Sequence, residues 1–427
     1  MGKLIEYVQS FDRRLVSPVG GGSREKFNKS VEKYCLNPEE TLARWMYFQS
    51  TEYGHDLVFS TMPMQNIVKY LGFKTSHTKN GVEYVVENQL RDEKDFKKIK
   101  TAGILKDELY KPYISCISTF KQISNKLVGG ACFGPFTVAG LLLGTERLCK
   151  SCIKEPAFLH KILGRITNWI IEMAQECERE GADFFWLAEP SAVLVSKEHF
   201  ESFSGMFLKH IYDSISIPGF LHVPGSTNYL IDAFIKTGAQ CLSLDSHVDM
   251  RDMGHKLSQD IVVLGNINSI SLLQDSADEI EKQVLRLNKE IKNFPNFIVS
   301  SGGGLSPDTP ENNLKALFNI TRRFPVRNRE DYSHIQLLWR TMADKSFEEV
   351  NQLISLNNWS RELILSSIQE ACIYLSRRLK KREVSIDEYQ KRMNEINKLM
   401  GTEHIDINSS ITIEDKTYRL KHIKYGF

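Results

Sequence analysis

The sequence predicts an α/β protein whose centre is a (β/α)8 TIM-type barrel, with a helical N-terminal preface and a helical C-terminal extension. Two observations predict this fold class. Between about residues 110 and 325, short apolar segments alternate with helical segments six times or so, which is typical of a parallel sheet. After Pro325 the alternation stops and mainly helical patterns follow. With this many units, a closed barrel is favoured over an open sheet.

The preface, residues 1–110, is expected to be mostly helical with one small hairpin. Pro18–Gly22 is a turn-rich break, and Pro38–Tyr53 has the acidic first turn that is typical of a helix. Gly54–Thr61 is expected to be the first strand of the barrel. The Asn80-Gly81 turn signal predicts a hairpin arm over Val82–Gln89.

Residues 111–327 are predicted to form the main part of the barrel. The apolar segments expected to be strands are Val128–Phe133, Ala182–Glu189, Ile217–His222, a run ending in Asp245, Ile261–Gly265 and Asn296–Ser301. The expected helices are Tyr113–Lys126, Val138–Lys154, Glu155–Glu180, Ser196–Ser214, Tyr229–Lys236, Ala277–Asn293 and Pro310–Arg323. Residues 328–427 are expected to form an extension of three or four helices, two of them Trp359–Arg382 and Ser385–Met400, followed by a small hairpin.

The composition narrows the class of protein. The chain has 427 residues, of which 25% are charged, and a net charge of +2; this lacks the basic stripe that nucleic-acid binding needs. No apolar run approaches the length that spans a bilayer. The eight cysteines are scattered and are expected to be reduced thiols. These observations predict a cytoplasmic protein with no nucleic-acid or membrane partner.

Three polar residues follow or end predicted strands, where barrel enzymes carry their chemistry. His222 precedes a Pro224-Gly225 turn, Asp245 ends the next strand, and Glu189 ends the strongly apolar segment before Pro190. We expect all three side chains to open onto one mouth of the barrel. A buried unpaired carboxylate is costly, which favours a role for Glu189. His222 could instead be a hydrogen-bonded core histidine, and Asp245 could be either a partner of His222 or a loop cap.

Several short motifs, taken in their order, resemble the uroporphyrinogen decarboxylase superfamily over roughly residues 50–325. They are Gly134-Pro135-Phe136-Thr137, Glu189-Pro190 and the Phe200–Ile211 helix, the strand of His222, Leu244-Asp245, Gly265-Asn266-Ile267 and the segment 302–317. The resemblance implies a (β/α)8 barrel with a helical preface. It also implies one of two chemistries, decarboxylation or corrinoid-dependent methyl transfer.

The decarboxylase branch carries an arginine motif near its N-terminus, which this chain lacks; Arg13, Arg14 and Arg24 are the nearby arginines. Many methyltransferases of the other branch hold zinc with His-x-Cys and Gly-Cys-Gly. Here those positions read His222-Val223-Pro224 and Gly302-Gly303-Gly304. Without the thiolates, the site would be harder and better matched to oxygen.

By this resemblance the predicted zinc ligands are Glu189, Glu201 and His222, with His222, Glu189 and Asp245 as the catalytic residues. The helix dipole and solvent also explain Glu201. Expected substrate contacts are Trp186, Asn266 and Gly303, although Trp186 could be core and Asn266 could belong to a turn.

The resemblance implies a zinc-dependent transfer of a methyl group from a small methylated substrate, such as an aryl methyl ether, to Co(I) of a corrinoid partner protein. Zinc on the ether oxygen would stabilise the leaving group. Three alternatives stay open. They are a metal-free decarboxylase, a methyltransferase from a methylcorrinoid to an acceptor, and a barrel that has lost its ligands and serves as a binding subunit.

Overall fold

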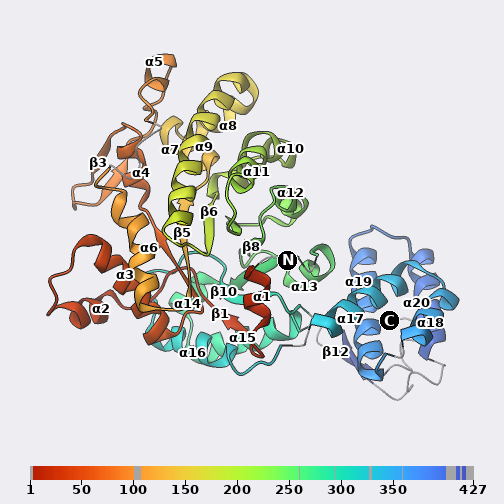
Figure 1. Cartoon of the computed structure of the whole chain (residues 1–427). Helices are drawn as coiled ribbons and strands as arrows, with labels where there is room; N and C mark the ends of the chain where they lie inside the picture. The colour runs from red at the N-terminus through yellow and green to blue at the C-terminus, as the bar shows by residue number, and fades with distance from the viewer. Residues whose placement is uncertain are drawn as a thin grey trace. The chain divides into compact units, whose positions relative to one another are not determined.

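The computed structural model describes residues 3–100, 107–258, 260–292, 294–326, 329–357, 359–400, 410–413 and 416–419. Its main sheet has eight parallel strands in the order β1-β10-β9-β8-β7-β6-β5-β2, and helices surround this sheet (Figure 1). The strands are β1 (Leu15–Val16), β2 (Leu57–Thr61), β5 (Leu127–Phe133), β6 (Phe184–Ala188), β7 (Gly219–Val223), β8 (Cys241–Leu244), β9 (Val262–Ile267) and β10 (Phe297–Ser301). The predicted (β/α)8 class is confirmed.

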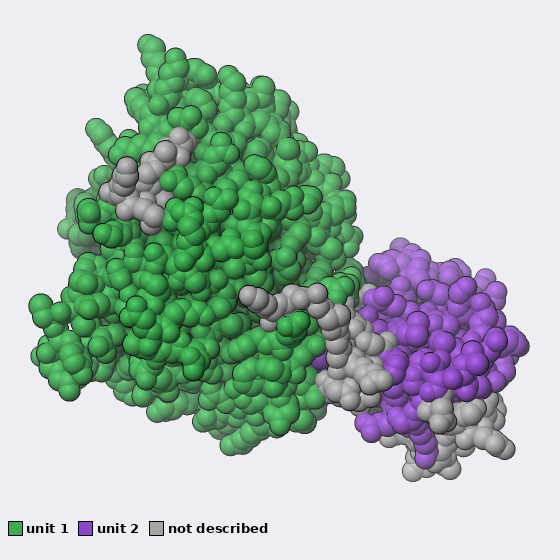
Figure 2. Space-filling model, viewed as in Figure 1, with its two compact units in different colours: residues 1–250, 256–291, 296–326 green, residues 251–255, 292–295, 327–427 purple. Residues whose placement is uncertain are grey.

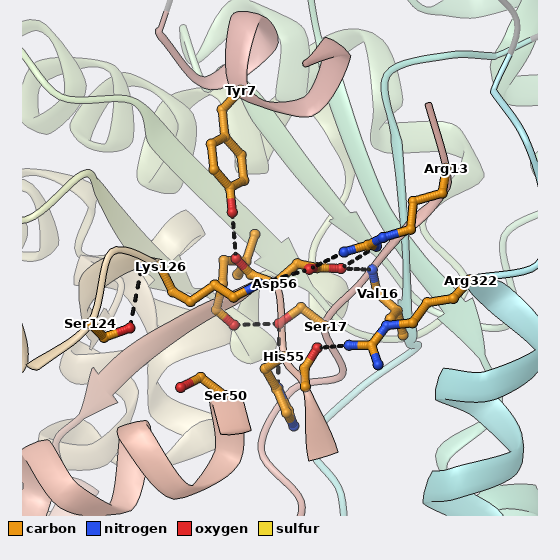
Figure 3. Close-up of polar contacts among 12 residues, drawn as sticks. Tyr7, Arg13, Val16, Ser17, Ser50, His55, Asp56, Ser124, Lys126 and Arg322 are labelled. Atoms are coloured by element: carbon orange, nitrogen blue, oxygen red, sulfur yellow. Dashed lines mark hydrogen bonds and ion pairs between the residues drawn. The ribbon is translucent and has the colours of Figure 1, made fainter. Parts of the chain in front are cut away.

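The two end strands of the sheet meet through Asp56, which directly precedes β2. The Asp56 amide donates to the Val16 carbonyl (3.1 Å), and the Val16 amide donates to the Asp56 carboxylate (2.9 Å). Arg13 binds the same carboxylate with both terminal nitrogens (2.8 and 3.0 Å), and Lys126 lies 3.2 Å from it. Figure 3 shows these side chains converging on Asp56. We call this group the seam cluster, because it joins β1 to β2.

The barrel interior is apolar toward the amino ends of the strands. One core cluster contains buried residues from all eight strands, among them Leu15, Phe184, Phe220, Leu264 and Ile298. Side chains from every strand of a closed sheet can meet only inside it, so this cluster fills the barrel. Helix α1 (Lys3–Gln9) belongs to the same cluster through Leu4, Ile5 and Val8. It therefore covers the end of the barrel at which the strands begin.

The helices before residue 327 follow the predicted alternation with several refinements. Their bounds are α2 (Arg24–Val31), α3 (Pro38–Phe48), α4 (Met64–Tyr70), α5 (Glu93–Phe96), α6 (Lys111–Ile123), α7 (Pro135–Leu143), α8 (Thr145–Lys154), α9 (Pro156–Arg179), α10 (Lys197–Phe200), α11 (Met206–Asp213), α12 (Ile231–Lys236), α13 (Met250–Lys256), α14 (Ser269–Gln274), α15 (Ala277–Glu290) and α16 (Glu311–Thr321). Shorter helical turns are π-helical at Gln49–Tyr53 and Glu201–Gly205 and 3₁₀ at Pro190–Leu194 and Asn228–Leu230. In the described residues no helix is both long and apolar enough to cross a membrane.

The structure corrects three of the predicted elements. The first strand is β1 rather than Gly54–Thr61, which contains β2; two residues are too few to show a strand period. The segment Val138–Lys154 is two helices, because Gly144, with a φ of 82°, separates α7 from α8. The segment Ser196–Ser214 is interrupted by the π-helical turn. The predicted hairpin is present as β3 (Thr75–His77) and β4 (Glu83–Val85).

Contacts divide the chain into two compact units, coloured separately in Figure 2. The first contains residues 1–250, 256–291 and 296–326, and holds the barrel. The second contains residues 251–255, 292–295 and 327–427. Its helices are α17 (Arg329–Asp344), α18 (Phe347–Asn357), α19 (Arg361–Lys380) and α20 (Ile386–Met400), and a hairpin is formed by β11 (Ser410–Ile413) and β12 (Lys416–Arg419). A separate core that includes Trp339, Ile368 and Ile396 packs these helices together.

Candidate functional site

A polar layer lies above the apolar filling of the barrel, toward the carboxyl ends of the strands, which we call the barrel mouth. Residues two apart on a strand face the same side. His222 follows Phe220 by two residues, Ser243 follows Cys241, Asn266 follows Leu264, and Ser300 follows Ile298; each earlier residue belongs to the interior cluster. Four neighbouring strands, β7 to β10, therefore turn polar side chains into the barrel near its mouth.

His222 is a neutral imidazole, and one of its two ring nitrogens is available to bind a ligand. Its ring is 7% exposed, and burial lowers its pKa because a charged ring would lose its hydration. Nδ1 lies 3.1 Å from the Ser243 carbonyl oxygen. A carbonyl can only accept, so Nδ1 carries the proton and Nε2 presents a lone pair. This nitrogen can accept a hydrogen bond from a ligand or donate its lone pair to a metal.

Two hydroxyls of the polar layer have unused hydrogen-bonding capacity. Within the described part of the chain, Ser243 Oγ and Ser300 Oγ are buried and have no partner. Unsatisfied buried hydroxyls are costly and call for a ligand or an ordered water. Asn266, by contrast, donates from Nδ2 to the carbonyls of Asp245 (3.0 Å) and Val248 (2.8 Å). It holds the β8 loop in place, and its contact with a substrate stays a prediction.

Glu189 directly follows β6 and does not face His222. The register pairs Ala188 with His222, so Glu189, one residue later, is out of phase and turns to the outer side of the sheet. Its fully buried carboxylate accepts hydrogen bonds from the amides of Phe136 (3.3 Å) and Thr137 at the start of α7. Ser204 Oγ also donates to it (3.3 Å). Burial nevertheless raises the pKa of Glu189 to about 7.

The three predicted zinc ligands are not brought together. Glu201 is 37% exposed and forms an ion pair with Lys236 (2.8 Å), while Glu189 caps α7 and His222 faces the barrel interior. Among the residues that the structure describes, no three His, Cys, Asp or Glu side chains are placed to hold one metal ion. The predicted set Glu189, Glu201 and His222 therefore does not fit a zinc ion in this arrangement.

Asp245 is held by the loops of the mouth rather than by His222. Its carboxylate accepts from the Gly225 amide (3.0 Å), the His247 amide (3.1 Å) and Ser246 Oγ (3.2 Å). His247 Nδ1 lies 2.6 Å from Oδ1. Burial alone would raise the pKa of Asp245, but these hydrogen bonds together lower it. The carboxylate is therefore charged and is paired with a histidine that the sequence analysis did not single out.

A cavity of about 310 Å³ lies between β2, α3 and the loop after β1. Its lining includes Trp45, Gln49, Phe59 and Thr61. Among the described residues that line it, Arg24 is the charged one, with its guanidinium 3.8 Å from the centre of the Trp45 ring. His55 also lines it, but burial lowers the pKa of His55 to about 3, so this imidazole is neutral.

Trp186 connects this cavity with His222. Its ring stacks on Phe59 at 4.8 Å, and Phe59 lines the cavity. The ring of Trp186 lies 5.9 Å from that of His222. Trp186 is 3% exposed and belongs to the interior cluster, and its ring contacts both Phe59 of the cavity lining and His222 of the polar layer. Trp186 is therefore a core residue, and its contact with a substrate stays a prediction.

The loop 302–304 approaches the β8 loop closely at one glycine. A Cβ on Gly302 would lie 2.5 Å from the Ser246 backbone nitrogen, so only glycine fits there without a shift. Gly303 has more room, with Ser269 Oγ at 3.6 Å from a Cβ, and its carbonyl accepts from Ser269 (3.0 Å). Gly304 has open space around it. This part of the rim therefore carries little side-chain bulk.

The sequence of the chain also matches the model of a known protein family. The family model described as uroporphyrinogen decarboxylase (URO-D) matches residues 17–324, which is most of the chain and the whole of the barrel sheet from Ser17 on. The chain belongs to this family. The resemblance proposed from the short motifs is thereby confirmed, and it now includes the N-terminal segment that contains the loop after β1.

Two relatives of this chain are named for different activities, methyl transfer and decarboxylation. A methylated-thiol–coenzyme M methyltransferase from Methanosarcina mazei is 27% identical over 199 residues, which cover 46% of this chain and 53% of the relative. A uroporphyrinogen decarboxylase from Hydrogenobaculum sp. is 26% identical over 305 residues, 68% of this chain and 84% of the relative. The chain thus spans about half the length of the first of these relatives.

A solved structure supports the fold. A methyltransferase from Methanosarcina mazei superposes with a TM-score of 0.65 and 20% sequence identity, covering 74% of this chain and 96% of that one. Similarity at this level of identity establishes the barrel architecture, and the chemistry has to be argued from the residues of the mouth.

Proposed function

We propose that this chain is a methyltransferase that removes a methyl group from a small methylated substrate and passes it to the reduced corrinoid of a partner protein. The observation that carries the proposal is the position of the N-terminal arginines. A decarboxylase of a polycarboxylated substrate needs several arginines in its site. Here Arg13 belongs to the seam cluster, and Arg14 is 2% exposed and donates to the Ile291 carbonyl (2.7 Å). Of the three, only Arg24 lines the cavity.

The cavity beside Trp186 supports a small substrate. Its volume is at the lower end of the range for small-molecule sites, and its walls combine aromatic and aliphatic side chains with the polar Gln49, His55, Ser60 and Thr61. A methyl group can pack against Phe59 and Trp45, while Arg24 provides one positive charge for an anionic end. The methyltransferase relative from Methanosarcina mazei is named for a methylated thiol, which is a compound of this size class.

Within this proposal, the polar layer serves the heteroatom that loses the methyl group. The hydroxyls of Ser243 and Ser300 can donate one hydrogen bond each to a developing negative charge, while Nε2 of His222, which is an acceptor, can bind a hydrogen-bond donor elsewhere on the substrate. The corrinoid, when bound with its carrier protein, supplies the nucleophile that takes the methyl group. The low rim at Gly303 and Gly304 leaves room for such a bulky partner to approach the mouth.

The zinc ion and the aryl methyl ether substrate stay predictions of the sequence analysis. Both depended on a metal held by Glu189, Glu201 and His222, which the observed side-chain positions do not support, so we derive no step through zinc. Metal analysis of the purified chain tests this point. Stoichiometric zinc that is lost both in Glu201→Ala and in His222→Ala would restore the predicted site; zinc-free active protein would exclude it.

The direct test is methyl transfer to free cob(I)alamin. We expect the purified chain to form methylcobalamin from at least one donor in a panel of a methyl thioether, an aryl methyl ether and a methylated amine. His222→Gln should abolish the transfer, and the exposed His210→Gln, on the outer helix α11, should not change it. Release of CO2 from uroporphyrinogen without corrinoid would instead assign a decarboxylase. Inactivity in both assays would contradict an enzymatic role.

A further inference from the structure

We propose that His247, oriented by Asp245, is the acid that protonates the leaving group in the proposed methyl transfer. The inference rests on the proposed function and adds a residue that neither the sequence motifs nor the family match identifies. In the loop after β8, Asp245 immediately follows the strand and His247 lies two residues further on. Both therefore lie at the mouth of the barrel, next to the strand that carries His222.

The pair is built by more than one contact. His247 Nδ1 lies 2.6 Å from Asp245 Oδ1, and the His247 amide donates to the same oxygen (3.1 Å). The Gly225 amide binds the other oxygen at 3.0 Å, so the carboxylate is fixed from the neighbouring β7 loop. A carboxylate held in this way fixes the tautomer and orientation of its histidine.

The loop that carries the pair is held from both sides. Asn228 Nδ2 donates to the His247 carbonyl (3.3 Å), and Asn266 Nδ2 donates to the Asp245 carbonyl (3.0 Å). Gly302 packs so closely against Ser246 that a side chain there would collide with the loop backbone. The position of His247 is thus set by the β7, β9 and β10 sides of the mouth together.

The two histidines of the mouth differ in a way that divides their roles. His222 is buried and neutral, with Nε2 as an acceptor. The side chain of His247 is 66% exposed, and its Nδ1 is occupied by a charged carboxylate, so Nε2 can exchange protons with solvent. An acid has to be recharged after every turnover, and an exposed ring beside a carboxylate meets this need better than a buried ring does.

The methyl carbon forms a bond with the reduced corrinoid acceptor as its bond to the heteroatom breaks, and the electron pair of that bond stays on the heteroatom. The Nε2 proton of the His247 imidazolium passes to the heteroatom. The products are the methylated acceptor, a neutral thiol or alcohol, and a neutral His247, which solvent reprotonates.

The test compares leaving groups in the same enzyme with cob(I)alamin as acceptor. A methyl thioether must leave as a thiolate and needs the proton, whereas trimethylsulfonium leaves as neutral dimethyl sulfide and does not. We expect His247→Gln to slow transfer from the thioether roughly 10²–10⁴-fold, the usual size of general acid catalysis. Its effect on transfer from the sulfonium should be far smaller. His210→Gln is the matched control and should affect neither donor.

Asp245 acts through His247, so its variant has a different signature. Asp245→Asn should lower kcat for the thioether with little change in KM, because the donor still binds but the acid is no longer oriented. An equal loss with both donors in His247→Gln, or no loss with either, would overturn the inference. If the wild-type chain transfers a methyl group neither from these two donors nor from the aryl methyl ether or the methylated amine, the proposed function itself fails, which is a distinguishable result.

Discussion

The two ends of the barrel use polar residues in opposite ways. At the amino end, the seam cluster gives the buried Asp56 carboxylate three partners, namely Arg13, Lys126 and the Val16 amide. At the mouth, Ser243 and Ser300 keep buried hydroxyls for which the described chain offers no partner. Satisfied polar groups stabilise a fold, while unsatisfied ones lower stability and are retained where a ligand binds. The difference assigns stability to one end and function to the other.

The largest expected effect is at the amino end. Asp56→Ala removes a fully buried carboxylate and leaves Arg13, Lys126 and the Val16 amide without their shared acceptor. We expect the free energy of unfolding of the barrel to fall by about 3–5 kcal/mol, as when one partner of a buried ion pair is removed. Chemical denaturation measures this. The exposed pair of Lys29 and Glu25 provides the control, since Glu25→Ala should change little.

The next prediction concerns the buried carboxylate of Glu189, which lies outside the mouth, and the pH dependence of the free energy of unfolding. Its native pKa of about 7 is raised above the ordinary 4.5, so its contribution to stability is fully present below about pH 4.5 and is lost as the pH rises through 7. The loss should be about 3 kcal/mol. Glu189→Gln removes this ionisation and should flatten the dependence of unfolding free energy on pH between about 4.5 and 7, the interval set by these two pKa values. An unchanged pH profile would contradict this assignment.

A further prediction concerns the close contact between Gly302 and the β8 loop at the mouth. Gly302→Ala places a Cβ 2.5 Å from the Ser246 nitrogen and must displace the β8 loop. We expect a loss of about 1–3 kcal/mol in stability, together with lower methyl transfer, because Asp245 and His247 lie on this loop. Gly304→Ala, which meets no atom within 4 Å, is the matched control. Equal effects of the two substitutions would contradict a tight contact between the loops.

The smallest effect on stability is expected from the unpaired hydroxyls. Ser243→Ala and Ser300→Ala remove buried groups that gain no hydrogen bond from the described chain, so unfolding free energy should stay the same or rise by up to about 1 kcal/mol. Binding of the methyl donor should weaken in both variants. A clear loss of stability would mean that these hydroxyls are structural, and the contrast between the two ends would then disappear.

The sequence was sufficient for the fold but only partly for the site. The apolar segments that became β5 to β10 are long enough to show their character, whereas β1 has two residues and no detectable period. His222 was predicted at the mouth and lies there. Glu189 was expected beside His222. Ala188 is the residue in register with His222. Because successive side chains alternate between the faces of a sheet, Glu189 lies on the opposite face.

The remaining site residues depend on contacts that no local pattern contains. Glu201 forms an ion pair with Lys236, which is the last residue of α12. His247 is a single histidine in a polar loop, and only the folded loop brings its ring to Asp245. The cavity combines the preface with β2, and such a surface can be recognised only after the chain has closed on itself.

The most direct test of the central claim is the rate of methyl transfer to cob(I)alamin in a matched pair of variants. The pair consists of His222→Gln, at the mouth, and Lys126→Ala, in the seam cluster, with both proteins assayed at a temperature where each is folded. The account predicts that His222→Gln loses the transfer while Lys126→Ala keeps it despite lower stability. Retained transfer in His222→Gln, or its loss in the folded Lys126→Ala protein, would contradict the claim that chemistry belongs to the mouth alone.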